Sequence, residues 1–305
     1  MKGTMKMSEF TIMIDTGCDI SESYIEENNL AVLPISFQID GASHDQGGWQ
    51  DITSTEFYNK LRSGSTTSTT LINPERFKEK FTEFAEKGES VLYISLSSAL
   101  SGTYQNSLLA LEEVKETHPN CNICCVDSIN ASAGIWTVVL LAVKKRKEGM
   151  PLEDTAKFLE ETKHKCFALF TVDDLMHLHR GGRVSKLQAV AGSMLGVKPL
   201  LNVSPIGKLE KTGKARGRKG ALADLASQMK NALDPDTKSL ESVIVGHGDC
   251  EEDAKTMLGL VKESYSVEES HIVTIGPVIG AHSGPGTIAL FFGGDMTREA
   301  YEKKA

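Results

Sequence analysis

The sequence has few of the features that mark several large classes of protein. Its 305 residues include six cysteines, scattered along the chain, whereas a secreted disulfide framework would be denser. Positive charge is not in excess, since 33 Lys and Arg against 41 Asp and Glu give a net charge of −8. A nucleic-acid binder is therefore not expected, because neutralising phosphates needs clustered cations. At about 150 residues per domain, the length suggests two domains or one large one.

Long apolar runs are missing as well. The best one, residues 135–143, is far shorter than the ~20 residues that a membrane-spanning helix needs, so no membrane insertion is expected. The first nine residues contain neither an apolar core nor a small-residue cleavage site and do not resemble a signal peptide. Together with the sparse cysteines, these absences predict a cytoplasmic protein.

Several catalytic and nucleotide-binding motifs are also absent. The chain has no G-x-S-x-G elbow, no Walker A loop, and no G-x-G-x-x-G after its first predicted strand. The C-x-x-C formed by Cys121 and Cys124 lacks the second pair of ligands that zinc needs, so we interpret Cys121, Cys124 and Cys125 as mainly buried core. No metal, nucleoside triphosphate or dinucleotide site is predicted.

The first half of the chain alternates short apolar segments with amphipathic ones. Helix starts are marked by the capping box from Thr53 to Glu56 and by Asn73 followed by Pro74. Such alternation is typical of βαβ units, so we predict an N-terminal α/β/α sandwich with a parallel sheet over residues 1–165. The expected strands are 10–14, 32–38, 91–96 and 121–126, and the expected helices are 21–28, 54–61, 74–87, 101–117 and 132–147, with residues 64–70 as a loop.

The second half has a different rhythm. Residues 198–203 and 208–211 flank the turn Ser204-Pro205-Ile206-Gly207, which is typical of a β-hairpin. Antiparallel pairing makes this half an α+β domain with a mixed or antiparallel sheet, which we place at residues 166–305. Further strands are expected at 166–171 and 242–247 and near Ile272 and Ile288, and helices at 151–163, 186–195, 221–233 and 251–265.

Polar loops follow the strands of the first half, where a parallel sheet binds ligands. The loop that begins at Ser97 offers Ser97, Ser98, Ser101 and Gly102 at the start of a helix, where free N–H groups and the helix dipole favour an anion. These serines would equally serve as helix caps alone.

Two glycine-rich segments lie in the second half. Residues 276–286 bracket His282 with glycines, which indicates either a backbone held close to a ligand or a tight structural crossover. Arg183 follows a Gly-Gly turn, from which its planar guanidinium would reach a carboxylate or phosphate, unless it is a solvated surface arginine.

Residues 211–219 form a basic run in an otherwise acidic chain. Its cations are Lys211, Lys214, Arg216, Arg218 and Lys219. We interpret the run as a solvated loop before a helix, or as a docking patch for an acidic partner, rather than as a nucleic-acid site.

Taken in order, these segments resemble the DegV family, and the resemblance runs from about residue 10 to the C-terminus. The chain departs from the family at Leu71-Ile72, where Gln-Pro is common, and at Gly17-Cys18, where serines are frequent. The markers are the turn from Asp15 to Asp19, Leu33-Pro34, Thr69-Thr70 with Asn73-Pro74-Glu75-Arg76-Phe77, Ser97-Ser98-Ala99-Leu100-Ser101-Gly102-Thr103-Tyr104, Leu178-His179-Arg180-Gly181-Gly182-Arg183 and Gly280-Ala281-His282-Ser283-Gly284-Pro285-Gly286.

The resemblance implies two α/β domains that enclose one long-chain fatty acid as ligand, with no other cofactor. It implies a non-catalytic subunit that presents the acyl carboxylate to a separate ATP-binding fatty-acid kinase subunit, which forms acyl phosphate for phospholipid synthesis. Arg183 matches the family's arginine near the head group, which works with the kinase. The residues that match the carboxylate-binding positions are Thr69, Ser97, Ser101, Gly102, His282 and Ser283.

Two other functions remain as alternatives. One is a lipid sensor or store without a kinase partner, which the sequence does not separate from a kinase subunit. The other is a lipid hydrolase or transferase that uses Ser101 or Ser283 with His282. The sequence disfavours it, because no acidic orienter or nucleophile elbow accompanies these serines.

Overall fold

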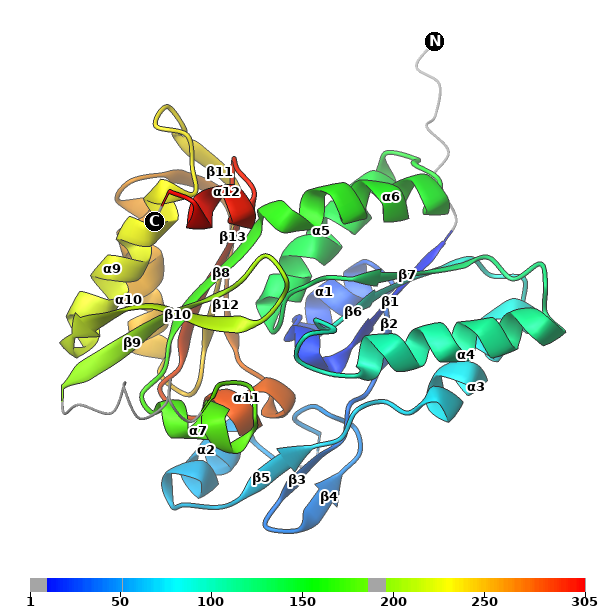
Figure 1. The fold of residues 1–305 in the computed structure, drawn as a ribbon, viewed down its shortest axis with the longest axis horizontal. Coiled ribbons are helices and arrows are strands. Elements are labelled where there is room, and N and C mark those ends of the chain that lie inside the picture. The colour runs from blue at the N-terminus through cyan, green and yellow to red at the C-terminus, as the bar shows by residue number, and fades with distance from the viewer. Residues whose placement is uncertain (1–9, 51, 186–195, 305) are drawn as a thin grey trace.

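The computed structural model describes residues 10–50, 52–185 and 196–304, which form two larger sheets and one small sheet (Figure 1). The first, which we call the parallel sheet, has the order β2-β1-β6-β7, and all of its neighbours are parallel. Helices α3 and α4 lie on one side of it and α5 and α6 on the other (Figure 1). Its strands are β1 (Thr11–Asp15), β2 (Ala31–Leu33), β6 (Val91–Ser95) and β7 (Ile123–Asp127).

The helices of this half begin largely where the sequence predicts. Thr53 accepts the Glu56 N–H at 3.2 Å at the start of α2, and Asn73 accepts the Arg76 N–H at 2.9 Å at the start of α3. The helical segments are η1 (Thr16–Cys18), α1 (Glu22–Glu27), α2 (Ser54–Arg62), α3 (Pro74–Glu86), α4 (Thr103–Thr117), α5 (Ala133–Lys147), α6 (Leu152–Thr162) and η2 (Lys163–Lys165).

The second large sheet, which we call the mixed sheet, has the order β10-β9-β8-β13-β11-β12 and is antiparallel except for the pair β11 and β12. Helices α9 and α10 contact it. Its strands are β8 (Cys166–Thr171), β9 (Val197–Val203), β10 (Leu209–Arg216), β11 (Ser239–His247), β12 (Ser266–Thr274) and β13 (Ile288–Gly293), and the helices of this half are α7 (Leu175–Arg180), α9 (Gly217–Asn231), α10 (Glu251–Lys262), α11 (Pro277–Ser283) and α12 (Arg298–Glu302). The predicted α/β fold with a parallel and a mixed sheet is confirmed.

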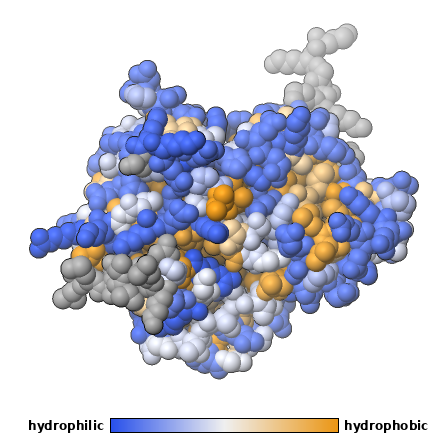
Figure 2. Space-filling view, viewed as in Figure 1, coloured by the Kyte–Doolittle hydropathy of each residue, from blue (hydrophilic) through white to orange (hydrophobic). Residues whose placement is uncertain are grey.

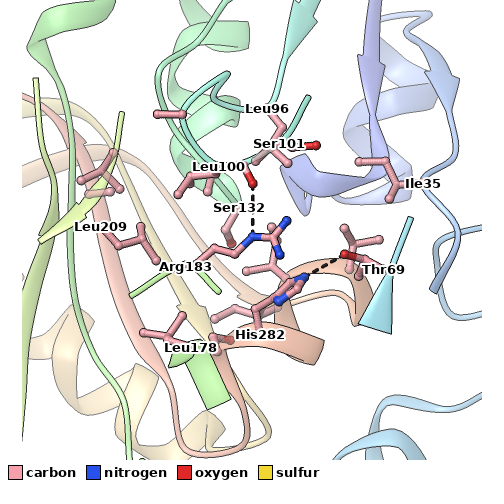
Figure 3. A pocket seen from close by; sticks show the side chains of 18 of the residues that line it. Ile35, Thr69, Leu96, Leu100, Ser101, Ser132, Leu178, Arg183, Leu209 and His282 are labelled. Atoms are coloured by element: carbon pink, nitrogen blue, oxygen red, sulfur yellow. Dashed lines mark hydrogen bonds between the residues drawn. The ribbon is translucent and has the colours of Figure 1, made fainter. Parts of the chain in front are cut away.

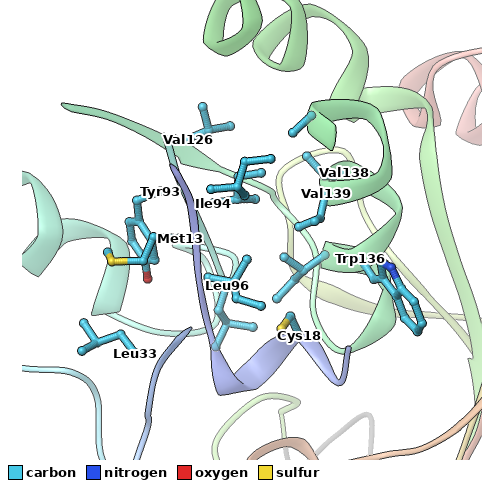
Figure 4. Packing of buried hydrophobic residues seen from close by; sticks show 14 of the residues in the cluster. Met13, Cys18, Leu33, Tyr93, Ile94, Leu96, Val126, Trp136, Val138 and Val139 are labelled. Atoms are coloured by element: carbon cyan, nitrogen blue, oxygen red, sulfur yellow. The ribbon is translucent and has the colours of Figure 1, made fainter. Parts of the chain in front are cut away.

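Helix α5 lies between the two large sheets. It contacts β1 and β6 of the parallel sheet and β8, β11 and β13 of the mixed sheet. Trp136, Val138 and Val139 are fully buried, and Figure 4 shows Val138 and Val139 on the side of the helix towards Ile94 of β6, with the Trp136 ring pointing away from that strand. This position explains why α5 is apolar around its circumference rather than amphipathic.

One apolar cluster joins both halves of the molecule, since it includes Ile94 of β6 and Phe291 of β13. It also contains Cys18, one of the departures from the family pattern (Figure 4). Burial raises the pKa of the Cys18 thiol well above its usual value, so this residue is core rather than a reactive group. The division at residue 165 falls just before β8, where the chain enters the mixed sheet, and stays a prediction.

A small third sheet was not predicted. The expected strand 32–38 divides into β2 and β3 (Phe37–Ile39), which belong to different sheets, because Pro34 interrupts the run. β3 pairs with β4 (Ala42–His44) and with β5 (Thr67–Thr69), which lies in the segment predicted as a loop. With α2, these strands bury an aromatic cluster of their own around Phe37, Phe57 and Tyr58.

Other expectations need correction. The basic run is not a loop, since β10 extends through Arg216 and α9 begins at Gly217. Cys121, Cys124 and Cys125 are only partly buried, although all three pack against the apolar core. The predicted helix 186–195 lies outside the described residues. Within the described ranges, no helix combines the length and the apolar character that crossing a membrane needs.

Candidate functional site

A cavity of about 430 Å³ lies between the parallel and the mixed sheets (Figure 3). One wall comes from loops at the carboxyl ends of the parallel strands, and the other from the inner face of the mixed sheet and from α11. Most of the lining is apolar; it includes Ile35, Leu96, Ala131, Ala168, Phe170, Val203, Ala289 and Phe291.

The outer surface contrasts with this interior. The face in Figure 2 is mainly hydrophilic, with apolar areas confined to a few places. Among the described residues, the large hydrophobic side chains that are exposed are Leu71, Leu109 and Ile206. Leu71 also lines the cavity although its exposed fraction is 49%, so it marks a point where the cavity meets solvent.

Polar side chains from distant segments meet at one part of this cavity. Thr69 Oγ1 at the end of β5 lies 2.8 Å from His282 Nε2 on α11, 213 positions along the chain (Figure 3). The segment 276–286 contains α11, so the tight crossover and a histidine that lines the cavity occur together. Of the predicted site residues, the lining includes Thr69, Ser101, Gly102, Arg183, His282 and Ser283.

Ser97 is the exception among the predicted site residues. Its side chain is fully buried and donates to the Gly207 carbonyl at 2.9 Å, in the turn between β9 and β10. The cavity lining includes the neighbouring Ser98 instead. A contact across the two halves of the molecule therefore occupies the Ser97 hydroxyl, and Ser97 is not among the residues that line the cavity.

Ser101 lies beside both the start of α4 and the cavity. Its hydroxyl lies 2.9 Å from Thr103 Oγ1 and accepts the Thr103 N–H at 3.3 Å, and the residue also lines the cavity. Because α4 begins at Thr103, the free N–H groups and the positive end of this 15-residue helix lie beside the cavity. This end of the cavity therefore favours an anionic group.

His282 is held as a neutral imidazole. Burial, with a smaller contribution from the positive charge of Arg183, lowers its pKa to about 4. Its Nδ1 is buried and has no hydrogen-bond partner among the described residues, and it lies so close to Gly181 that a Cβ atom there would be 2.2 Å away. A proton on Nδ1 would be buried without an acceptor.

The surroundings of Nδ1 indicate which nitrogen of the neutral His282 ring carries the proton. With Nδ1 unprotonated, the ring carries its proton on Nε2 and donates to Thr69 Oγ1. The Thr69 hydroxyl, having accepted this bond, keeps its own hydrogen for another acceptor. Since Thr69 lines the cavity, this hydrogen is available to an acceptor that enters the cavity.

Arg183 lies in the wall between the cavity and the outside. Its Nε donates to the Leu100 carbonyl at 3.1 Å (Figure 3), and its Nη1 donates to the Gly181 carbonyl. It also lines an outer groove with Lys208 and Lys211. Partial burial lowers the pKa of the guanidinium, which nevertheless stays charged at neutral pH, so Arg183 is not a freely solvated arginine.

Ser132 was missed by the sequence analysis, which treated it only as a helix start. It lines the cavity and is buried, and its hydroxyl donates to Asp19 Oδ2 at 2.5 Å. The nearest sequence signal was the polar turn from Asp15 to Asp19 at the end of the first strand, which identified one partner of this bond but not the other.

Comparison with known proteins decides the family. The model described as an uncharacterised protein of the DegV family matches residues 9–294. The chain belongs to the DegV family. A DegV domain-containing protein of Clostridium perfringens is 39% identical to it over 290 residues, which are 95% of this chain and 99% of that protein. A second such protein, from Streptococcus pyogenes, is 33% identical over 289 residues, with 95% and 99% covered.

Solved DegV structures share the fold. A DegV lipid binding protein of Thermotoga maritima has a TM-score of 0.83 and 28% identity, covering 95% of this chain and 99% of that chain. A fatty-acid-binding DegV protein of Thermus thermophilus has a TM-score of 0.83 and 29% identity, with 94% and 99% covered. A fatty acid binding DegV protein of Streptococcus agalactiae has a TM-score of 0.81 and 26% identity, with 95% and 100% covered.

Proposed function

We propose that this chain binds one long-chain fatty acid in the cavity, with the carboxylate beside Thr69 and His282 and the acyl chain along the mixed sheet. The observation that carries this proposal is an apolar cavity with hydrogen-bonding groups gathered at one part of it. The fatty-acid ligands of the similar DegV proteins support it. Each buried CH₂ group contributes about 0.8 kcal/mol, so the acyl chain dominates affinity.

The carboxylate end needs compensation for burial. An ionised carboxylate that leaves water must be paired and hydrogen-bonded. The Thr69 hydroxyl supplies a donor, the N-terminus of α4 beyond Gly102 supplies a favourable field, and Arg183 supplies a nearby positive charge. A bound anion also stabilises a protonated His282, so its pKa rises above about 4 when the ligand is present.

We further propose that the chain is a non-catalytic binding subunit that presents the carboxylate to an ATP-binding kinase subunit. Arg183 favours this role, since it lines both the cavity and the outer groove and so connects the head group with the surface. A sensor or store without a kinase is the second candidate, because the same cavity would serve it.

The hydrolase alternative has less support. His282 Nε2 pairs with Thr69 rather than with a serine, and Ser101 bonds to Thr103. Ser283 Oγ has no hydrogen-bond partner within the described part of the chain, so no base activates it.

Mass spectrometry of a denatured extract of the purified protein tests fatty-acid binding. An apolar cavity is costly to leave wet, so we expect co-purified fatty acid at about one molecule per chain. Delipidated protein should also bind added oleate or palmitate. Absence of extracted lipid together with no binding of either acid would overturn the proposal.

A further inference from the structure

The turn after β1 has no role in the function proposed so far. Its first carboxylate, Asp15, is structural: it is buried and accepts bonds from the Gly17 N–H at 2.9 Å, the Tyr93 hydroxyl at 2.9 Å and the Leu96 N–H at 3.1 Å. Its second carboxylate, Asp19, instead contacts two segments that are distant in sequence.

Asp19 binds the starts of two helices at once. Its Oδ2 accepts the Ser132 hydroxyl at 2.5 Å, immediately before α5, and its Oδ1 accepts the Gly276 N–H at 2.8 Å, immediately before α11. The contact is close, since a Cβ atom at Gly276 would lie 2.5 Å from Oδ1. The turn after β1 is thus joined to both helices through one side chain.

Both partners belong to walls of the cavity. Ser132 lines it directly, and the seven-residue helix that follows Gly276 carries His282 at its other end. The side of this helix is held by the small sheet and α2, because Thr67 Oγ1 donates to the Ala281 carbonyl at 3.0 Å and the Tyr58 hydroxyl donates to the Ile275 carbonyl at 2.7 Å. Asp19 supplies the corresponding anchor from the parallel sheet.

We propose that Asp19 is a positioning residue for fatty-acid binding: its ionised carboxylate anchors the start of α11 to the parallel-sheet half, and thereby sets where His282 meets Thr69. This inference rests on the proposed function. A carboxylate suits the task because its two oxygens accept two bonds together, and charge-assisted bonds are about twice as strong as neutral ones. A protonated Asp19 keeps both neighbours but loses the charge.

The backbone angles of Asp19 and Ser132 and the titratable groups around Asp19 agree with a functional role for Asp19. Asp19 and Ser132 both have positive φ angles, 51° and 54°, although neither is glycine. Burial and the nearby Asp15 raise the pKa of Asp19 to about 7, against the opposing bonds from Ser132 and Gly276. Cys18 of the same turn and Tyr58 of α2 also face it, and the first turns of α5 and α11 contain no acidic residue.

The raised pKa of Asp19 determines whether ionisation of this carboxyl group raises or lowers the stability of the fold. A carboxyl group whose pKa is raised from 3.8 to about 7 on folding contributes stability below pH 3.8 that is lost as the pH rises through 7. At pH 8 the ionised Asp19 therefore lowers the stability of the fold. Asp19→Asn should then have a melting temperature at pH 8 no lower than that of the wild type, even though its binding is weaker.

The test compares wild type, Asp19→Asn and Asp19→Ala, with Asp224→Asn on the exposed face of α9 as the matched control. Affinity for oleate is measured from pH 6 to pH 8.5. We expect Asp19→Asn to bind about three- to tenfold more weakly than the wild type at pH 8, a ratio that shrinks towards one at pH 6. A ratio that is constant with pH indicates a merely structural residue and overturns the proposal.

A second measurement does not depend on the lipid. The NMR signals of the His282 ring should shift in Asp19→Asn and Asp19→Ala but not in Asp224→Asn, because α11 moves when its anchor is weakened. Unchanged His282 signals in both Asp19 variants overturn the proposal whether or not the protein binds oleate. Failure of the wild type to bind oleate would instead count against the proposed function.

Discussion

The apolar wall of the cavity and its polar part are built in different ways. The wall comes from alternate residues of regular strands, such as Ala168 and Phe170 of β8 and Ala289 and Phe291 of β13. Their neighbours Phe167 and Phe292 point to the opposite face and pack in a second core. The polar part instead collects single residues from separate segments, so the wall depends on volume and the polar part on the placement of a few atoms.

The largest effect should come from a bulky side chain that fills the cavity from its apolar wall. Ala289→Trp inserts a ring into the cavity from near the start of β13, so fatty-acid content and oleate affinity should fall about 100-fold or more, while overpacking costs the fold about 1–3 kcal/mol. Ala223→Trp, on the exposed face of α9, is the control. Extracted lipid at the wild-type level in a folded Ala289→Trp protein would place the acyl chain elsewhere.

The next effect concerns the polar part. His282→Ala and Thr69→Val each remove one partner of the 2.8 Å hydrogen bond between the two side chains. Each should weaken oleate binding by about 1–3 kcal/mol, or roughly 5- to 150-fold. The double variant should cost less than the sum, because the two side chains act together. Ser68→Ala, exposed on the same strand, is the control. Wild-type affinity in both single variants would show that the head group binds elsewhere.

Arg183→Ala should affect fatty-acid binding much less than presentation of the carboxylate to the kinase. We expect oleate affinity to stay within about threefold of the wild type, because the acyl wall and the Thr69–His282 pair remain. Acyl-phosphate formation with the cognate kinase should fall about tenfold or more. Arg180→Ala, in an exposed position one turn earlier, is the control. Unchanged turnover with lost lipid binding would contradict the assignment.

The smallest effect is expected at the basic run. Lys214 and Arg216 are exposed on β10, whereas Arg218 pairs with Asp253 at 2.9 Å and is structural. Reversing Lys214 and Arg216 to Glu should slow association with the kinase by about two- to tenfold and leave lipid content unchanged. The alternative of a solvated surface predicts no change, and binding kinetics that match the wild type would support it.

The sequence predicts the regular parts of the fold well. The capping residues Thr53 and Asn73 accept the expected backbone bonds, because caps are local. The small sheet was missed because its strands have three residues each, too few for an alternation to be recognised. The start of β10 was predicted as the second strand of the hairpin, but its later residues, 212–216, resembled a loop because β10 is an edge strand, where lysines are common.

The site was predicted through the family resemblance rather than from local pattern. No periodicity links Thr69 with His282, which lie 213 positions apart. The sequence also did not indicate that the Ser97 hydroxyl bonds to Gly207 of another segment. Asp19 was noticed as part of a polar turn, but its partners Ser132 and Gly276 are set by the packing of both halves, which a local pattern does not contain.

Helix α5 has a consequence for how the chain is divided. Because it lies between the two large sheets, cutting the chain at residue 165 would leave α5 on the first fragment with its mixed-sheet side exposed to water. The second fragment would lose the apolar partner of β8, β11 and β13. The two halves are therefore distinct in their sheets but do not fold independently. They should melt together in one cooperative transition.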